Sequence, residues 1–96
     1  MPAIEAELGK GEDVDARDSA QHTALHLACI CNKLKCARTL LRRGADPNAK
    51  NDVQSTPLHF ACSNGAIECV RLVLEAGADM DVRNNGDLTP RDYAQF

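Results

Sequence analysis

The stretch His22-Thr23-Ala24-Leu25-His26-Leu27-Ala28-Cys29 decides the fold, because it returns 33 residues later as Ser55-Thr56-Pro57-Leu58-His59-Phe60-Ala61-Cys62. A third copy follows as Leu88-Thr89-Pro90-Arg91-Asp92-Tyr93-Ala94. The segment Leu40–Asp46 is echoed at the same interval by Val73–Asp79. A constant period of this size is typical of stacked small units, each of which buries its apolar face only against its neighbours.

Each unit is predicted to begin a helix at a threonine, because Thr is a competent N-cap residue. The caps are Thr23, Thr56 and Thr89. Pro57 and Pro90 follow at the first helical position, where a missing N–H is harmless. The third helical position can reach back to the cap, as in a capping box, and it holds His26, His59 and Asp92. This first helix is expected to run about two turns and to end at a residue that accepts a left-handed backbone, Asn32 or Gly65.

The apolar residues that follow are spaced by three and four positions, which is typical of one face of a second helix. They are Leu34, Ala37, Leu40 and Leu41, then Ile67, Val70, Val73 and Leu74. Gly44 and Gly77 are expected to end these helices, before a polar β-turn or hairpin leads to the next threonine. With Leu74 in the core, Leu74→Ala is expected to cost about 2–5 kcal/mol. Loss of the cap in Thr56→Ala should cost less, about 1 kcal/mol.

At these residues the chain resembles the ankyrin repeat family. The matching motifs are Thr-Pro-Leu-His-x-Ala, the two-Leu helix and Gly-Ala-Asp-x-Asn. The resemblance implies an all-α, ankyrin-type solenoid of helix-turn-helix units joined by short β-turns or hairpins. It covers residues 1–96 as one domain: 18–50 and 51–83 match whole repeats, 1–17 the back half of an earlier repeat, and 84–96 the front half of a later one.

The sequence departs from the family pattern at a few positions. Gln21, Gln54 and Asp87 stand where the family commonly has glycine in its hairpin turn. Glu7 falls at a buried apolar position, and Arg91 replaces the Leu of Thr-Pro-Leu. Polar residues near both ends fit solvent-facing caps, which repeat stacks need for solubility, and equally fit a segment of a longer array.

The composition favours a protein partner over nucleic acid or a membrane. The 96-residue chain has a net charge of −3, whereas phosphate binding needs a cationic surface. Charge is layered, with six acids and two bases in residues 1–18, six bases and one acid in 33–50, and seven acids and three bases in 51–96. Each block is interpreted as a solvated repeat surface. Nothing resembles a signal peptide or a membrane span, which favours the reducing cytosol or nucleus.

Four of the five cysteines keep the 33-residue interval, Cys29 with Cys62 and Cys36 with Cys69. They are interpreted as small buried thiols without metal or disulfide, because no close pair of the zinc-binding kind occurs. Cys31 lies outside the interval and is interpreted as an incidental surface thiol with no evident base beside it.

The histidines are assigned to structure. His26 and His59 share one repeat position and are expected to bridge turns through hydrogen bonds. His22 precedes the cap and shares no helical face with His26. No Gly-x-Ser-x-Gly, phosphate-binding glycine loop or His-Glu-x-x-His occurs. The chain is therefore predicted not to be an enzyme, and to have no catalytic residue, metal or cofactor.

In the ankyrin family, partners usually meet the concave surface of hairpin tips and first helices, and the resemblance implies the same surface here. By register, its residues would be Ser19, Ala20, His22, Ile30, Cys31, Lys50, Asp52, Val53, Ser55, Ser63, Asn64, Arg83, Asn85 and Leu88. Ile30, Val53 and Leu88 are expected at its centre, because apolar residues outside the core mark contact surfaces. The alternative is that they are the scattered exposed apolar residues of any surface. The predicted function is a non-catalytic adaptor or scaffold module that binds another protein.

A second hypothesis belongs to a different class. The chain would be a structural spacer, or a self-associating repeat segment of a longer ankyrin array. A monomer with a saturable protein ligand favours the adaptor. Concentration-dependent association through the terminal half-repeats favours the assembly unit.

Asn48 follows Gly44-Ala45-Asp46-Pro47, a segment that looks like the one asparaginyl hydroxylases modify in ankyrin proteins. Pro47 departs from the usual aliphatic neighbour, and the equivalent position one repeat on is Asp81. The alternative is a turn residue whose side chain hydrogen-bonds its own backbone.

Overall fold

The computed structural model describes residues 14–94, and this range holds five α-helices and no strand. They are α2 (Ala24–Ile30), α3 (Leu34–Arg42), α4 (Pro57–Ser63), α5 (Ile67–Glu75) and α6 (Pro90–Tyr93). Among the helices of this range, none is long and apolar enough to cross a bilayer. The predicted all-α class is confirmed. Glu7 and most of the half-repeat 1–17 lie outside the described residues, and the repeat boundaries stay a prediction.

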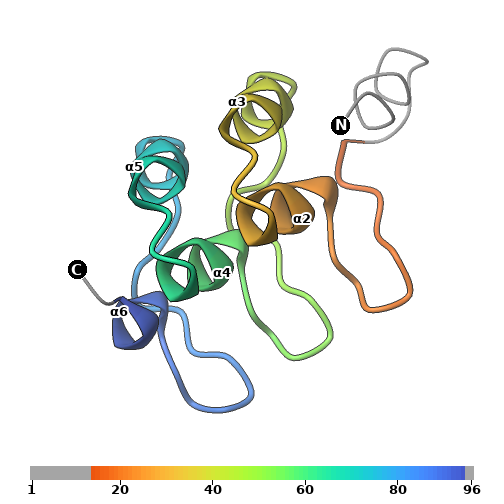
Figure 1. Cartoon of the computed structure of the whole chain (residues 1–96). Helices are drawn as coiled ribbons and strands as arrows, with labels where there is room; N and C mark the ends of the chain where they lie inside the picture. Colours follow the sequence, from red (N-terminus) through yellow and green to blue (C-terminus); the bar gives the residue numbers. More distant parts are fainter. Residues whose placement is uncertain (1–13, 95–96) are drawn as a thin grey trace.

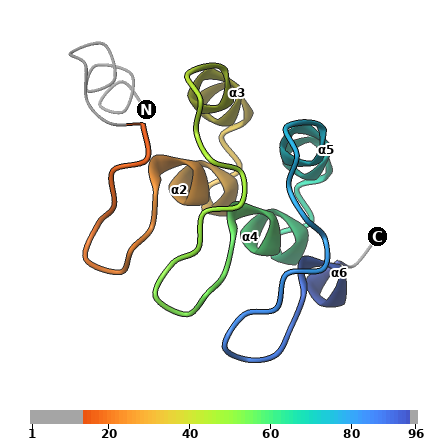
Figure 2. The ribbon, with the colours of Figure 1, turned by 180° about the vertical axis from the view of Figure 1, so that it is seen from behind.

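The helices stack in two rows (Figure 1). We call α2, α4 and α6 the first row, and α3 and α5 the second row. Neighbours in a row pack together, and each second-row helix packs on the first-row helix before it in the chain. The loops before α2, α4 and α6 extend away from the second row, as the view from behind also shows (Figure 2). We call these loops fingers 1, 2 and 3, residues 17–22, 50–55 and 83–88.

Hydrogen bonds at the start of the first-row helices match the predicted capping box in all three units. The backbone N–H of the cap donates to the side chain three residues on, at 3.0 Å from Thr23, 2.9 Å from Thr56 and 2.8 Å from Thr89. The acceptors are His26 Nδ1, His59 Nδ1 and Asp92 Oδ2. These bonds fix the backbone at the position where each helix begins.

Left-handed residues end the helices where the sequence predicted them. Asn32 and Gly65 follow the first helices of their units at φ 55° and 66°, and Gly44 and Gly77 follow the second helices at 91° and 103°. At Gly77 a side chain would meet no atom within 4 Å. Glycine is therefore required there by the backbone conformation and not by crowding.

The two rows share one core. Leu25, Leu40, Leu58 and Val73 are fully buried, and small residues between them let the helices approach closely. The fully buried small residues are Ala28, Cys29, Ala37, Ala61, Cys62 and Cys69. Cys36 is buried as well, so all four cysteines at the 33-residue interval belong to the core.

The prediction that Leu74 lies in the core is wrong, and Ile67 of the same predicted apolar face is exposed as well. The side chains of Ile67 and Leu74 are 49% and 37% exposed, whereas their equivalents on α3, Leu34 and Leu41, are partly buried. The reason is position in the stack. α5 packs on α3, but no second-row helix follows α5 within residues 14–94. The fully buried residue at this end of α5 is Val73.

Candidate interaction surface

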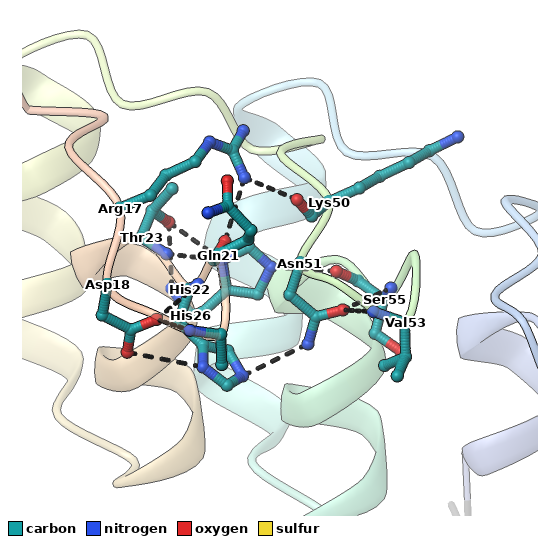
Figure 3. Close-up of polar contacts among 11 residues, drawn as sticks. Arg17, Asp18, Gln21, His22, Thr23, His26, Lys50, Asn51, Val53 and Ser55 are labelled. Atoms are coloured by element: carbon teal, nitrogen blue, oxygen red, sulfur yellow. Dashed lines mark hydrogen bonds and ion pairs between the residues drawn. The ribbon is translucent and has the colours of Figure 1, made fainter.

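A polar residue at the base of each finger holds the loop in shape, and Figure 3 shows those of fingers 1 and 2. In finger 2, Asn51 Oδ1 accepts hydrogen bonds from the backbone N–H groups of Val53 (3.0 Å) and Ser55 (2.9 Å). Asp18 in finger 1 and Asn84 in finger 3 accept the equivalent pairs at 2.9–3.1 Å. Our sequence reasoning missed these residues, although an Asp or Asn recurring every 33 residues before a turn was a usable signal.

The finger tips adopt a left-handed backbone without glycine. Gln21, Gln54 and Asp87 have φ values of 65°, 62° and 61°. These are the positions where the family commonly has glycine, so the departure concerns the residue type and not the conformation. A non-glycine residue in this region is held there at an energetic cost by its surroundings.

Main-chain hydrogen bonds join neighbouring fingers. The N–H of Asp52 donates to the Ala20 carbonyl at 3.1 Å, and the N–H of Asn85 donates to the Val53 carbonyl at 2.8 Å. Because the same bond recurs at the same register position, the three fingers form one continuous row. Their tips therefore act as a single surface and not as independent loops.

Basic side chains lie at the finger bases. The Arg17 guanidinium donates to the carbonyls of Gln21 and Lys50, which adds a second link between fingers 1 and 2 (Figure 3). In finger 3, Arg83 pairs with Asp87 at 3.1 Å. The Lys50 side chain is exposed and makes no ion pair within residues 14–94.

Two histidines tie the finger row to the first-row helices. His26 Nε2 lies 2.9 Å from the Ser55 carbonyl, and His59 Nε2 lies 3.0 Å from the Leu88 carbonyl. Since Nδ1 accepts the N–H of the cap, Nε2 carries the ring proton and donates it to the next finger. Burial lowers the pKa of both imidazoles and so favours this neutral form. Their predicted bridging role is confirmed.

His22 links fingers 1 and 2 through its side chain (Figure 3). Asn51 Nδ2 lies 3.2 Å from His22 Nε2. Because Asn51 Oδ1 is occupied by backbone N–H groups, the amide is the donor and the ring nitrogen is the acceptor. His22 Nδ1 faces Asp18 Oδ2 at 3.6 Å, and the ring packs against Phe60 and His26. The backbone N–H of His22 also lowers the pKa of the Asp18 carboxyl.

Most of the predicted contact residues are exposed: Ser19, Ile30, Cys31, Lys50, Asp52, Val53, Ser63, Asn64, Arg83, Asn85 and Leu88. Ala20 and His22 are partly buried. Ser55 is only 5% exposed, and its hydroxyl accepts a hydrogen bond from the Asn84 amide at 3.1 Å. Placing Ser55 on the contact surface is therefore corrected, because this residue holds two fingers together.

Apolar side chains are exposed on α2 and on two fingers. The exposed fractions are 47% for Val53, 40% for Leu88 and 37% for Ile30. Leu27, three residues before Ile30 on the same helix, is 36% exposed and adds to them. Our sequence reasoning missed Leu27 because it lies inside the repeated motif, where a core role is expected. Its equivalent Phe60 is partly buried.

The side chain of Asn48 bonds to the following repeat and not to its own turn. Its Nδ2 donates to the Gly77 carbonyl at 3.0 Å, and its Oδ1 accepts the N–H of Asp79 at 2.9 Å. Its own backbone N–H donates to Asp46 Oδ1. The side chain thus joins the turn after α3 to the turn after α5. Hydroxylation of Asn48 stays a prediction.

Burial keeps Cys29, Cys62 and Cys69 as protonated thiols. Burial raises the pKa of Cys29 to about 12 and also raises the pKa values of Cys62 and Cys69. All five cysteines are free, and Cys31 is the exposed one. Over the described range 14–94, no group of three or more His, Cys, Asp or Glu side chains could hold a metal ion.

The capping boxes, the two helix rows and the joined fingers define a protein built from stacked helix-turn-helix repeats. The family model for ankyrin repeats (3 copies) matches residues 2–84. The chain therefore belongs to the ankyrin repeat family, whose repeats generally mediate protein–protein interaction and are typically non-catalytic. Comparison with individual curated proteins gave no match.

Proposed function

We propose that the chain is a non-catalytic adaptor or scaffold module that binds another protein through the finger tips and the exposed side chains of the first-row helices. The observation that carries the proposal is the row of joined fingers with Val53 and Leu88 exposed on it, next to a helix that exposes Leu27 and Ile30. Apolar side chains on a pre-organised frame lose little conformational entropy when a partner covers them. Free thiols fit an intracellular, reducing compartment.

The described residues argue for binding over chemistry. Each of the two buried histidines makes hydrogen bonds to a threonine cap and to a finger, and burial keeps Cys29, Cys62 and Cys69 protonated. A general base needs a ring nitrogen within reach of a substrate proton, and a nucleophile needs a base beside it. His26 and His59 use both ring nitrogens inside the fold.

The proposal is tested on a partner captured by pull-down and then purified. Val53→Asp should weaken the affinity for the partner by at least about fivefold, since a central apolar contact contributes more than ~1 kcal/mol to binding. Leu74→Asp is the matched control, because it changes an exposed apolar residue to the same acid on α5. Binding that resists Val53→Asp and fails with Leu74→Asp would overturn the proposed surface.

The exposed edge of α5 supports a second candidate function, self-association or stacking within a longer array. Ile67 and Leu74 are exposed where their equivalents on α3 are partly buried. An added second-row helix would cover them. Sedimentation over a range of concentrations separates the two candidates: dimers that Leu74→Asp abolishes and Val53→Asp leaves intact indicate assembly, and a monomer at all concentrations supports the adaptor.

A further inference from the structure

α3 carries an unbalanced positive charge. Lys35, Arg38 and Arg42 are exposed and lie at spacings of three and four, so they share one stripe of the helix. Lys33 at its N-cap and Arg43 at its C-cap add two further exposed cations at the ends of the helix. Within residues 14–94 none of the five side chains forms an ion pair or a hydrogen bond.

The N-terminal part of this charge works against the stability of α3, whereas Arg42 and Arg43 lie at the C-terminal end, where the dipole favours cations. The first turn contains no acid, and Lys33 and Lys35 lie at the helix end where the dipole disfavours cations. Like charges at spacings of three and four, as between Lys35, Arg38 and Arg42, also repel each other. The two lysines at the N-terminal end and the repulsion along the helix therefore need a reason other than helix formation.

The repeat fold does not require these cations, because α5 is the same element without them. Glu68 and Glu75 occupy on α5 the positions that Lys35 and Arg42 occupy on α3. Ala66 stands at the register position of Lys33, and Ala76 at that of Arg43. Arg38 is matched by Arg71 alone. The charge is thus a property of this one helix.

A shallow groove runs between α3 and α5, beside the basic stripe. It is lined by Leu34, Arg38, Glu68, Arg71, Leu72 and Glu75. Leu34 and Leu72 are partly buried and give it an apolar floor, while the α5 side carries Arg71 between the carboxylates of Glu68 and Glu75. A phosphate backbone is charged along its whole length and has no apolar side chain for this floor, so it would meet these carboxylates without a compensating contact. A peptide can place apolar side chains on the floor and its own carboxylates on α3.

We propose that the basic stripe of α3 and the groove beside it form a second docking surface, which takes an acidic protein segment bearing apolar side chains. The surface lies in the second row, on the side of the first row away from the fingers (Figures 1 and 2). The finger surface and the α3 surface can therefore be occupied together, so that one chain holds two partners.

The probe is a fluorescein-labelled peptide of Glu and Leu with the Leu residues at helical spacing, titrated by fluorescence anisotropy. Arg42→Glu should weaken it by about threefold or more, and Lys35→Glu with Arg42→Glu by about tenfold, because each reversal replaces an attraction by a repulsion. Lys50→Glu is the matched control: it makes the same change in charge at an exposed, unpaired cation on a finger, and should leave binding unchanged.

Three outcomes would overturn the proposal: equal loss with Lys50→Glu, equal binding of a shuffled peptide whose Leu residues line no face, or tighter binding of an oligothymidylate of the same charge. Circular dichroism confirms that each variant is folded, which is expected because Lys35→Glu and Arg42→Glu give α3 residues that α5 already carries. Val53→Asp should leave the peptide bound. A negative result for the α3 surface is thus distinguishable from a negative result for the finger surface.

Discussion

At the scale of single residues, two buried imidazoles connect the parts of the stack. His26 and His59 each accept the N–H of a threonine cap at Nδ1 and donate from Nε2 to a carbonyl of the next finger. A proton added at Nδ1 would remove the acceptor and set two N–H groups against each other. The packing of each repeat on the next therefore depends on the neutral ring.

We expect the free energy of unfolding to fall as the pH drops below about 6.5, the ordinary histidine value. Burial lowers the folded-state pKa of His26 and His59, so the unfolded chain binds protons first. The stabilisation by the two neutral rings is complete above a pH of about 6.5 and is lost as the pH falls toward their folded-state pKa values. Urea titrations at several pH values measure this, and His59→Gln should weaken the dependence. Equal stability at pH about 7 and about 5 would contradict the assignment.

Backbone hydrogen bonds lower the pKa values of the Asp18 and Asp92 carboxyls, from the N–H of His22 and of Thr89 respectively. Their stabilisation is present above the ordinary value of about 3.9 and is lost only as the pH falls below it. As the pH falls, the carboxyl effect thus begins more than two pH units below the point where the histidine effect begins, at about 3.9 against about 6.5.

Because the finger tips have a left-handed backbone, we expect glycine to make the fold more stable there than the native residue does. Gln54 is exposed and has φ 62°, a conformation that costs a non-glycine residue about 1 kcal/mol. Gln54→Gly should stabilise the fold by about 0.5 kcal/mol after the greater entropy of the unfolded chain is subtracted. Gln54→Val should destabilise it, because a branched side chain tolerates this region least. A denaturant midpoint that moves the other way for either variant would refute the argument.

At the scale of helices, the boundaries of each helix could be predicted from the sequence, whereas the burial of its apolar face could be predicted only in part. Threonine caps and closing glycines act locally, so they could be recognised in the chain. The apolar spacing of α5 indicated a face, but the exposure of Leu74 depends on whether another helix follows. Asn48 and Ser55 bond across repeats, and such partners are set by stacking and not by neighbours in sequence.

The structure revises the expected order of core substitutions. Leu40 is fully buried, so Leu40→Ala should cost about 2–5 kcal/mol. Thr56→Ala removes a buried cap hydroxyl that lies 2.9 Å from His59 Nδ1, and should cost about 1–2 kcal/mol. Leu74→Ala should cost less than about 1 kcal/mol, because the side chain is 37% exposed. Guanidinium titrations give the order, and Leu74→Ala as the most damaging change would show that α5 is covered.

Charge reversal at equivalent positions of α3 and α5 is expected to change the stability of the protein in opposite directions. Lys35 and Glu68 hold the same position in the first turn of their helices, where an acid is favoured by the helix dipole. Lys35→Glu should stabilise the protein and Glu68→Lys should destabilise it, each by about 0.3–1 kcal/mol. Thermal unfolding at low ionic strength measures both. A loss of stability in Lys35→Glu would mean that the cation is satisfied within the fold.

At the scale of the whole molecule, one stack presents two different faces. Finger tips joined by main-chain hydrogen bonds expose Val53 and Leu88, and the second row exposes a basic helix beside a helix of mixed charge. Hydrogen bonds between repeats make the stack a rigid frame for both. Sequence periodicity predicted the repeat frame. The residues that differ from one repeat to the next distinguish the two faces, and their grouping on a face is visible only in the structure.

Amide hydrogen exchange on the free and partner-bound chain tests the central claim most directly. The finger N–H groups of Val53, Gln54 and Ser55 are hydrogen-bonded within the loop, so their exchange is measurable before binding. We expect the partner to slow exchange in all three fingers and at the C-terminal end of α2, and to leave α5 unchanged. Protection confined to the exposed edge of α5, with finger exchange unaltered, would contradict it.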